Sequence, residues 1–228
     1  MPDNNPSRPS RRWIKWALIL AVHAAVLTIL LITDETTYDA FHRWKEHWDR
    51  EDLPLSRVLN DDDTWEFFAS FGLWMSSIAL AVIVWRLDNR WRRLVPLLAA
   101  GVIVATTLTS VLSKTVGRVR PYRAMGKSVY LRFGEAWTHG HSMAFPSGHA
   151  TFAAAIAAFL ALAYPRLKGF GWVMAVGCGI SRIYFTKHFP GDIYAGFLMG
   201  HYVMNGTWRL FDRWWPTANA PTPDAGSS

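Results

Sequence analysis

The sequence is poor in cysteine, since Cys178 is the only one among its 228 residues. A single thiol excludes a framework of intramolecular disulfides. Cys178 lies in an apolar run, so we expect it to pack as a small hydrophobic side chain. The sequence also has no internal repeat and no nucleic-acid-binding motif. Its net charge of +7 therefore favours a membrane surface, because many Lys and Arg residues flank apolar runs.

A signal-peptide cleavage site is missing too. The first apolar run, 13–33, has Arg8, Arg11, Arg12 and Lys15 before it or at its start, and no small-x-small pattern comes after it. The run is also long for the apolar region of a signal peptide. We therefore expect it to remain in the protein as a membrane anchor.

Apolar residues, in contrast, are abundant: 51% of the residues are hydrophobic and 13 are Trp. A membrane-spanning helix needs about 20 apolar residues, and the first three of six apolar segments reach that length easily. The last three contain more polar residues. The pattern predicts an all-α, integral membrane six-helix bundle, with five spans and one re-entrant segment as the alternative. The segments cover 13–33, 65–85, 94–113, 148–165, 170–186 and 192–211.

The remaining residues are assigned around a membrane domain at 13–215. We expect 1–12 to be a cytoplasmic tail and 216–228 to be disordered. Residues 34–63 contain ten acidic and four basic residues, a net charge of −6, and are expected outside the cytoplasm. Their stretch "YDAFHRWKEHW" spaces aromatic residues three and four apart. This spacing fits an amphipathic helix in the outer interface or a solvated acidic loop with a few buried aromatic residues.

Basic residues favour an orientation with both termini inside. A cluster precedes the first helix, and the short hairpin "RLDNRWRR" holds four Arg residues. With this orientation, three polar stretches lie at the outer membrane face, although they are far apart in the chain. They are "SKTVGRVRP" at 113–121, "PSGH" at 146–149 and "SRIYFTKHFPGD" at 181–192.

These stretches contain the parts of an anion site. We select three of their cations together with a hydroxyl and a glycine of "PSGH", and we expect a helix to begin near 148. Glycine permits close approach of a ligand to the backbone, and a helix start attracts anions. Such a site suits a phosphate. The candidate phosphate-binding residues are Lys114, Arg120, Ser147, Gly148 and Arg182.

Two histidines add reactive groups to this site. His149 and His188 can transfer a proton or attack an electrophile near neutral pH. Asp192 follows His188 by four residues, close enough to orient its ring. His188 and Asp192 could also bind a metal ion, but the neighbouring cations would repel one, so we expect no metal site.

His201 and Asn205 share one helix face deep in the last apolar segment. Buried polar residues within a membrane span are candidates for function. We favour a structural role for this pair, as partners in a hydrogen bond between helices.

The three stretches together resemble the superfamily of type 2 phosphatidic acid phosphatases and vanadium-dependent haloperoxidases. "PSGH" matches fully, and so does Ser181-Arg182, five residues, His188, three residues, Asp192. The first motif differs, because the family usually has six residues between Lys and Arg-Pro. Here five separate Lys114 from Arg120, and Ser113 stands at the usual lysine position. The resemblance covers roughly 94–205, which would be the catalytic core.

This resemblance implies a mechanism and a substrate. His188 would attack phosphorus and form a phosphohistidine, and Asp192 would hold its ring in the reactive tautomer. His149 would protonate the leaving oxygen and then activate the hydrolytic water. The five phosphate-binding residues would stabilise the transition state, without a metal or other cofactor. We expect a phosphatase of a lipid phosphate in the inner or plasma membrane, acting on the periplasmic or exterior side.

Two alternatives remain. A haloperoxidase would share the pocket and hold vanadate. The haloperoxidases suggested by this family are soluble, however, and six apolar segments argue against a soluble protein. A non-enzymatic membrane binding or scaffold protein is the other alternative. The intact set of two histidines and one aspartate disfavours it.

Overall fold

A computed structural model describes residues 11–50, 61–130, 134–139 and 143–215. Residues 1–10 and 216–228, most of the two expected tails, lie outside this described part. Within it the chain is all-α, as predicted, apart from turns, loops and two isolated β-bridges. In chain order the helices are α1 (Arg11–Arg50), α3 (Asp62–Ser70), α4 (Trp74–Leu87), α5 (Trp91–Val116), α6 (Glu135–His139), α7 (Gly148–Ala163), the 3-10 helix η1 (Pro165–Leu167), α8 (Lys168–Tyr184) and α9 (Pro190–Trp214).

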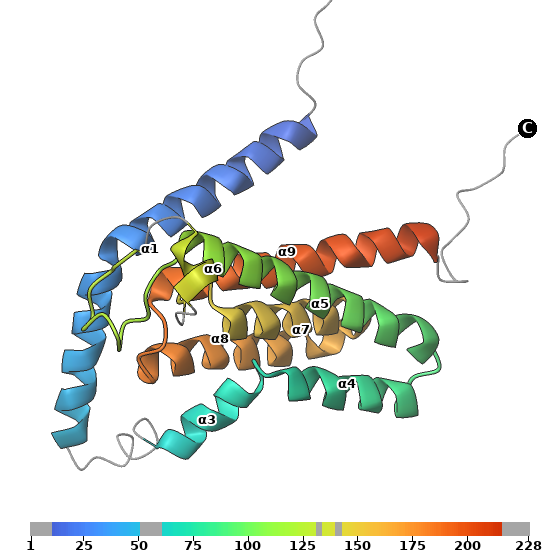
Figure 1. The fold of residues 1–228 in the computed structure, drawn as a ribbon. Coiled ribbons are helices and arrows are strands. Elements are labelled where there is room, and N and C mark those ends of the chain that lie inside the picture. Colours follow the sequence, from blue (N-terminus) through green and yellow to red (C-terminus); the bar gives the residue numbers. More distant parts are fainter. Residues whose placement is uncertain (1–10, 51–60, 131–133, 140–142, 216–228) are drawn as a thin grey trace, which may run out of the picture.

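The centre of the bundle is α7, which packs against α5, α8 and α9 (Figure 1). Every residue from 150 to 160 is buried. A helix enclosed by protein on all sides is expected to be apolar all round, which explains its run of Ala, Leu and Phe.

The contact between α7 and α9 is close because α9 presents glycines. A Cβ atom at Gly200 would overlap the Thr151 carbonyl, and one at Gly196 would lie 2.6 Å from the Ser147 carbonyl oxygen. The backbone amide of Ser147 also donates to the Asp192 carbonyl at 2.9 Å. These contacts fix the start of α7 against the start of α9, where two of the three motifs lie.

The outer faces of the helices are strongly apolar. Ile32 on α1, Ile103 on α5 and Val173 on α8 are each more than 60% exposed. By length and composition, α1 and α5 can each cross a membrane. Exposed apolar surface of this extent needs lipid around it. The chain is therefore an integral membrane protein.

The predicted single span at 65–85 is wrong in one respect, because the structure divides it into α3 and α4. The two helices meet at a bend of 58° and together could form one broken span. The break contains Gly72, where a Cβ atom would lie 2.6 Å from Cys178 Sγ and 2.9 Å from the His149 carbonyl oxygen. The chain thus bends where it passes close to α7 and α8.

Helix α1 continues far beyond the first apolar run. Its 40 residues span about 60 Å at 1.5 Å per residue, so the helical interpretation of "YDAFHRWKEHW" is confirmed and the loop is excluded. Tyr38 packs against Phe189 with ring centroids 5.7 Å apart, and Lys45 Nζ lies 3.7 Å from the Tyr184 ring centroid. The second half of α1 therefore runs across the end of the bundle where α8 ends and α9 begins (Figure 1).

Two predictions about residues inside the bundle have different outcomes. Cys178 is fully buried among Ala153, Ala157 and Ala175, as a small hydrophobic residue would be. The prediction for Asn205 is wrong, because its amide donates to the His201 carbonyl at 2.7 Å within α9. An interhelical bond in this region comes instead from His23 of α1, whose ring nitrogens bond the hydroxyls of Tyr194 and Tyr202 at 2.7 and 2.8 Å.

Candidate active site

A pocket of about 260 Å³ opens where α5 ends and α7 begins. Five of the eight predicted site residues line it, and they come from all three motifs. Ser147, Arg182 and Asp192 are not among the lining residues. The pocket is lined by Thr109, Ser110, Ser113, Lys114, Arg120, Met143, Pro146, Gly148, His149 and His188.

His188 lies in the loop between α8 and α9 and is only 2% exposed. Its backbone amide donates to the Arg182 carbonyl at 3.3 Å, and its Nδ1 lies 2.8 Å from the Ala144 carbonyl oxygen. A carbonyl oxygen only accepts, so Nδ1 carries the hydrogen in this contact. Burial lowers the pKa of His188, although nearby Asp192 acts in the opposite direction. The ring is therefore neutral at pH 7, with a lone pair on Nε2.

Asp192 lies next to the His188 ring, at a longer distance than the Ala144 carbonyl. Its Oδ2 is 3.7 Å from His188 Nδ1, within ion-pair distance. The same oxygen accepts from the Phe189 amide at 2.8 Å, and Oδ1 accepts from Arg118 at 2.7 Å. The shorter contact of Nδ1 is thus with the Ala144 carbonyl, while the predicted part of Asp192 in orienting the ring stays a prediction.

The start of α7 brings two motif residues into the pocket. Ser147 is the N-cap of the helix, and its buried hydroxyl accepts from the Ala150 amide at 3.4 Å. Ser147 therefore caps the helix, while Gly148 and His149 line the pocket. The positive end of the α7 dipole lies beside the pocket, which favours an anion there.

Lys114 and Arg120 bring positive charge to the pocket. Arg120 Nε donates to the Met143 carbonyl at 3.3 Å, and Lys114 Nζ lies 4.9 Å from the ring centroid of Trp137 on α6. Helix α5 stays regular past the displaced lysine, since the Gly117 amide donates to the Ser113 carbonyl at 3.0 Å. Ser113 and Lys114 both line the pocket, so the one-residue shift requires no distortion of the helix.

Arg182 occupies the last turn of α8 and lies close enough to the pocket residues His149 and Arg120 for the charges to interact. Its Nε donates to Ser181 Oγ at 3.3 Å, and its guanidinium lies 5.5 Å from the Phe185 ring centroid. Its carbonyl accepts from the amides of Lys187 and His188. In this arrangement Arg182 shapes the loop that carries His188.

Residues 93–216 match the family described as the PAP2 superfamily. The chain belongs to this superfamily. The matched region contains all three motifs, so the resemblance inferred from them is confirmed.

The PAP2 chain is also similar to curated proteins and solved structures. It is 34% identical over 114 residues to a lipid A 1-phosphatase of Rhizobium johnstonii, covering 49% of this chain and 46% of that protein. It is 26% identical over 141 residues to an undecaprenyl-diphosphatase of Sulfolobus acidocaldarius, covering 60% and 64%. The chain thus spans only about half to two thirds of these relatives.

Two solved structures share the fold. One is LpxE of Aquifex aeolicus, with a TM-score of 0.54 and 21% identity over 73% of this chain and 93% of that one. The other is a transmembrane PAP2-type phosphatidylglycerolphosphate phosphatase of Bacillus subtilis, with a TM-score of 0.56 and 21% identity over 85% and 96%.

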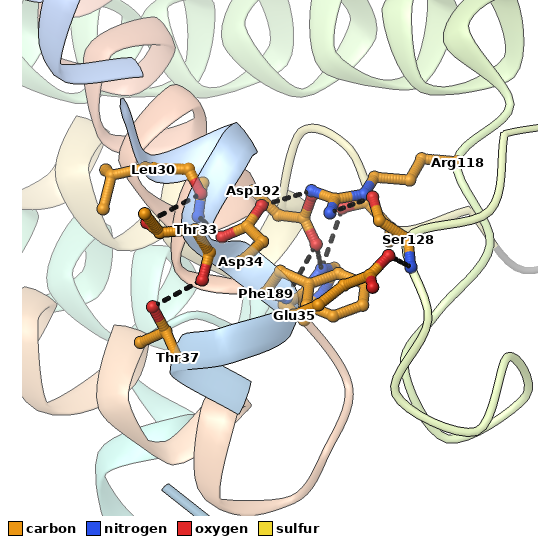
Figure 2. A network of polar contacts seen from close by, with 12 residues as sticks. Leu30, Thr33, Asp34, Glu35, Thr37, Arg118, Ser128, Phe189 and Asp192 are labelled. Atoms are coloured by element: carbon orange, nitrogen blue, oxygen red, sulfur yellow. Dashed lines mark hydrogen bonds and ion pairs between the residues drawn. The ribbon is translucent and has the colours of Figure 1, made fainter. Parts of the chain in front are cut away.

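Sequence reasoning missed two residues of this PAP2 chain, Arg118 and Asp34. Both are completely buried, and Figure 2 shows Arg118 reaching from its loop to Asp34 on α1 and Asp192. Arg118 stands two residues before Arg120, in a loop whose many basic residues were a usable signal. Asp34 carries no such signal, because it is one of many acidic residues that follow the first apolar run.

Proposed function

We propose that the chain is a membrane phosphatase that hydrolyses a phosphomonoester or pyrophosphate on a lipid through a phosphohistidine at His188. The main support is the His188 ring, which lines a pocket together with two cations and the start of a helix. Its Nδ1 is hydrogen-bonded to the Ala144 carbonyl. This arrangement leaves Nε2 available as a nucleophile next to groups that attract phosphate.

The proposed reaction has two steps. Nε2 of His188 attacks phosphorus, the bond to the leaving oxygen breaks, and His149 gives that oxygen a proton. His149 then takes a proton from water, which attacks the phosphohistidine and releases phosphate and the neutral ring. Lys114, Arg120 and the amides at the start of α7 stabilise the charge on the transferring group. The positive charge of the pocket makes a metal ion unnecessary.

An apolar groove of about 340 Å³ supports a lipid substrate. Thr106 and Phe152 line this groove, while Thr109 and His149 line the pocket. Thr106 and Thr109 are three residues apart on α5, and His149 and Phe152 are three residues apart on α7. The groove therefore lies about one helical turn from the pocket along both helices. An acyl or isoprenyl chain in the groove would place its phosphate in the pocket.

The substrates and the orientation are part of the proposal. The named relatives suggest a lipid A phosphate or a polyprenyl diphosphate, with phosphatidic acid and phosphatidylglycerol phosphate as further candidates. The basic hairpin at 86–93 and the basic residues before the first helix favour an active site at the periplasmic or exterior face.

Phosphate release from these four lipids, in detergent with EDTA, tests the activity. We expect release from at least one lipid and an acid-labile phosphoenzyme, both absent in His188→Ala. Loss of activity with EDTA, restored by a divalent ion, would contradict the metal-free mechanism. Halide oxidation with added vanadate would favour a haloperoxidase, and lipid binding without turnover would favour a binding protein.

Cysteine labelling tests the orientation in a Cys178→Ala background, since alanine suits this apolar site better than serine. We expect a cysteine at exposed Asp39 to react from outside and one at exposed Leu87 to react from inside. The reverse pattern would place the active site in the cytoplasm.

A further inference from the structure

A buried charge network joins Asp34 on α1 to Arg118 and to Asp192, which follows His188 by four residues (Figure 2). Arg118 Nη1 donates to Asp34 Oδ2 and to Asp192 Oδ1, each at 2.7 Å. Arg118 Nη2 donates to Ser128 Oγ at 2.6 Å, and its guanidinium lies 4.1 Å from the Phe189 ring centroid. Asp34, Arg118 and Asp192 are each 0% exposed. Three charged groups withdrawn from solvent in this way are costly unless each is paired and hydrogen-bonded.

Asp34 also binds the first turn of α9 directly. Its Oδ1 accepts from the Gly191 amide at 2.8 Å, while Oδ2 bonds Arg118. A negative group at a helix start is stabilised by the helix dipole. A Cβ atom at position 191 would lie 2.7 Å from Asp34 Oδ2, so the glycine is what lets the carboxylate approach so closely.

The two carboxylates are held in matching ways. Each gives one oxygen to Arg118 and the other to a backbone amide, Gly191 for Asp34 and Phe189 for Asp192. These amides lie within three residues of His188, on the segment that carries its ring. Removing the Asp34 charge would leave Asp192 as the one carboxylate paired with Arg118 in this network, and would give the Gly191 amide a weaker, uncharged acceptor.

We propose that Asp34 is a positioning residue for His188, acting through Arg118, Asp192 and the first turn of α9. Asp34 lies outside the region that matches the PAP2 family, 93–216. Helix α1 thus contributes a part of the active site as well as a membrane anchor. The inference rests on the proposed phosphatase function, because it assigns Asp34 to the positioning of that nucleophile.

The test compares Asp34→Asn with Asp39→Asn. Asp39 is exposed on the same helix, so the control removes the same charge from α1 without touching the network. In Asp34→Asn we expect kcat to fall roughly 10–100-fold, the scale known for residues that orient a metal-binding histidine through a hydrogen bond. KM should change little, because the phosphate-binding side chains remain, and the control should match the wild type.

Equal kcat values per folded molecule in Asp34→Asn and Asp39→Asn would overturn the inference. If Asp34→Asn does not fold, Arg118→Lys takes its place. This variant keeps the charge, but an ammonium cannot reproduce the planar guanidinium contacts, so the same fall in kcat with unchanged KM is expected. An unchanged kcat in Arg118→Lys would overturn the inference as well.

Hydrogen exchange separates this inference from the proposed function. If the wild-type protein released no phosphate from any lipid, the proposed function would fail. Amide exchange of 188–193 would then decide the inference alone, since it needs no turnover. Faster exchange in Asp34→Asn, or in Arg118→Lys, than in Asp39→Asn supports the positioning role, and equal exchange overturns it.

Discussion

The two ends of the helical bundle both carry ion pairs, but they differ in burial and in what they join. At the α4–α5 hairpin, Asp88 pairs with Arg90 at 2.8 Å, and the arginine side chain is 52% exposed. At the pocket end, Arg118 pairs with Asp34 and Asp192, and all three side chains are completely buried.

The first pair stabilises a turn between neighbouring residues, and Asp88 also accepts from the Tyr164 hydroxyl at 2.7 Å. The second set joins residues 84 and 74 positions apart in the chain. The same residue types thus close a turn at one end and hold a proposed catalytic loop at the other. Because of this difference in burial, we expect the Arg118 ion pairs to contribute more to stability and activity than the Asp88–Arg90 pair.

The largest effect is expected when Arg118 is removed. Arg118→Ala leaves two buried carboxylates without a cation, which typically costs about 3–5 kcal/mol. Guanidinium unfolding in detergent micelles would measure the free energy of unfolding. A loss no larger than that of Arg90→Ala would contradict the distinction between the two ends.

A smaller loss is expected for the displaced lysine. Lys114→Ala should lower kcat/KM about 100-fold, roughly 2.7 kcal/mol, because it removes one donor to the phosphate. Exposed Lys127→Ala, in the following loop, serves as the control. Since Ser113 lines the same pocket, Ser113→Lys with Lys114→Ser should regain much of the activity. Steady-state kinetics with wild-type kcat/KM in Lys114→Ala would remove Lys114 from the site.

A third effect concerns the dependence of stability on pH. The pKa of His188 is lowered from 6.5 in the folded protein. Below pH 6.5 the unfolded chain therefore binds a proton that the folded protein excludes, and stability falls as the pH falls toward the lowered pKa. The slope contributed by His188 is at most about 1.4 kcal/mol per pH unit. Unfolding between pH 7 and pH 5 should show a smaller slope in His188→Gln, and identical slopes would refute this account.

The smallest effect is expected at the hairpin end. Arg90→Ala removes a pair whose arginine is half exposed to solvent, so the free energy of unfolding should change by less than about 1 kcal/mol. Its kcat/KM should equal that of the wild type, because the residue lies at the opposite end of the bundle from the pocket. A tenfold loss of kcat/KM would show that the two ends are coupled.

Local patterns made much of the fold and part of the site predictable. The apolar run after "PSGH" predicted α7, and the motif spacing predicted the pocket residues Arg120, His149 and His188. The bend between α3 and α4 was not predictable, because it depends on how Gly72 packs against Cys178. The length of α1 stayed ambiguous for a similar reason, since Tyr38 and Lys45 find their partners, Phe189 and Tyr184, far along the chain.

The network around Arg118 could not be predicted because its partners are distant in sequence. Asp34 is one of ten acidic residues in 34–63, and nothing in the sequence distinguishes it from the nine that follow. The capping role of Ser147 was not predicted, for a different reason. Its hydroxyl suits a phosphate or a helix N-cap equally well, and only the structure shows that it caps α7.

The contact between His188 and Ala144 also determines how the site tolerates mutation. The group that accepts the Nδ1 hydrogen belongs to the main chain, and every amino acid carries the same carbonyl. Alanine scanning therefore cannot detect it, and drift of the side chain at position 144 does not by itself remove it. The position of the Nδ1 hydrogen depends on the path of the backbone at Ala144. Insertions or deletions near this loop should therefore break the contact between His188 and the Ala144 carbonyl more readily than substitutions do.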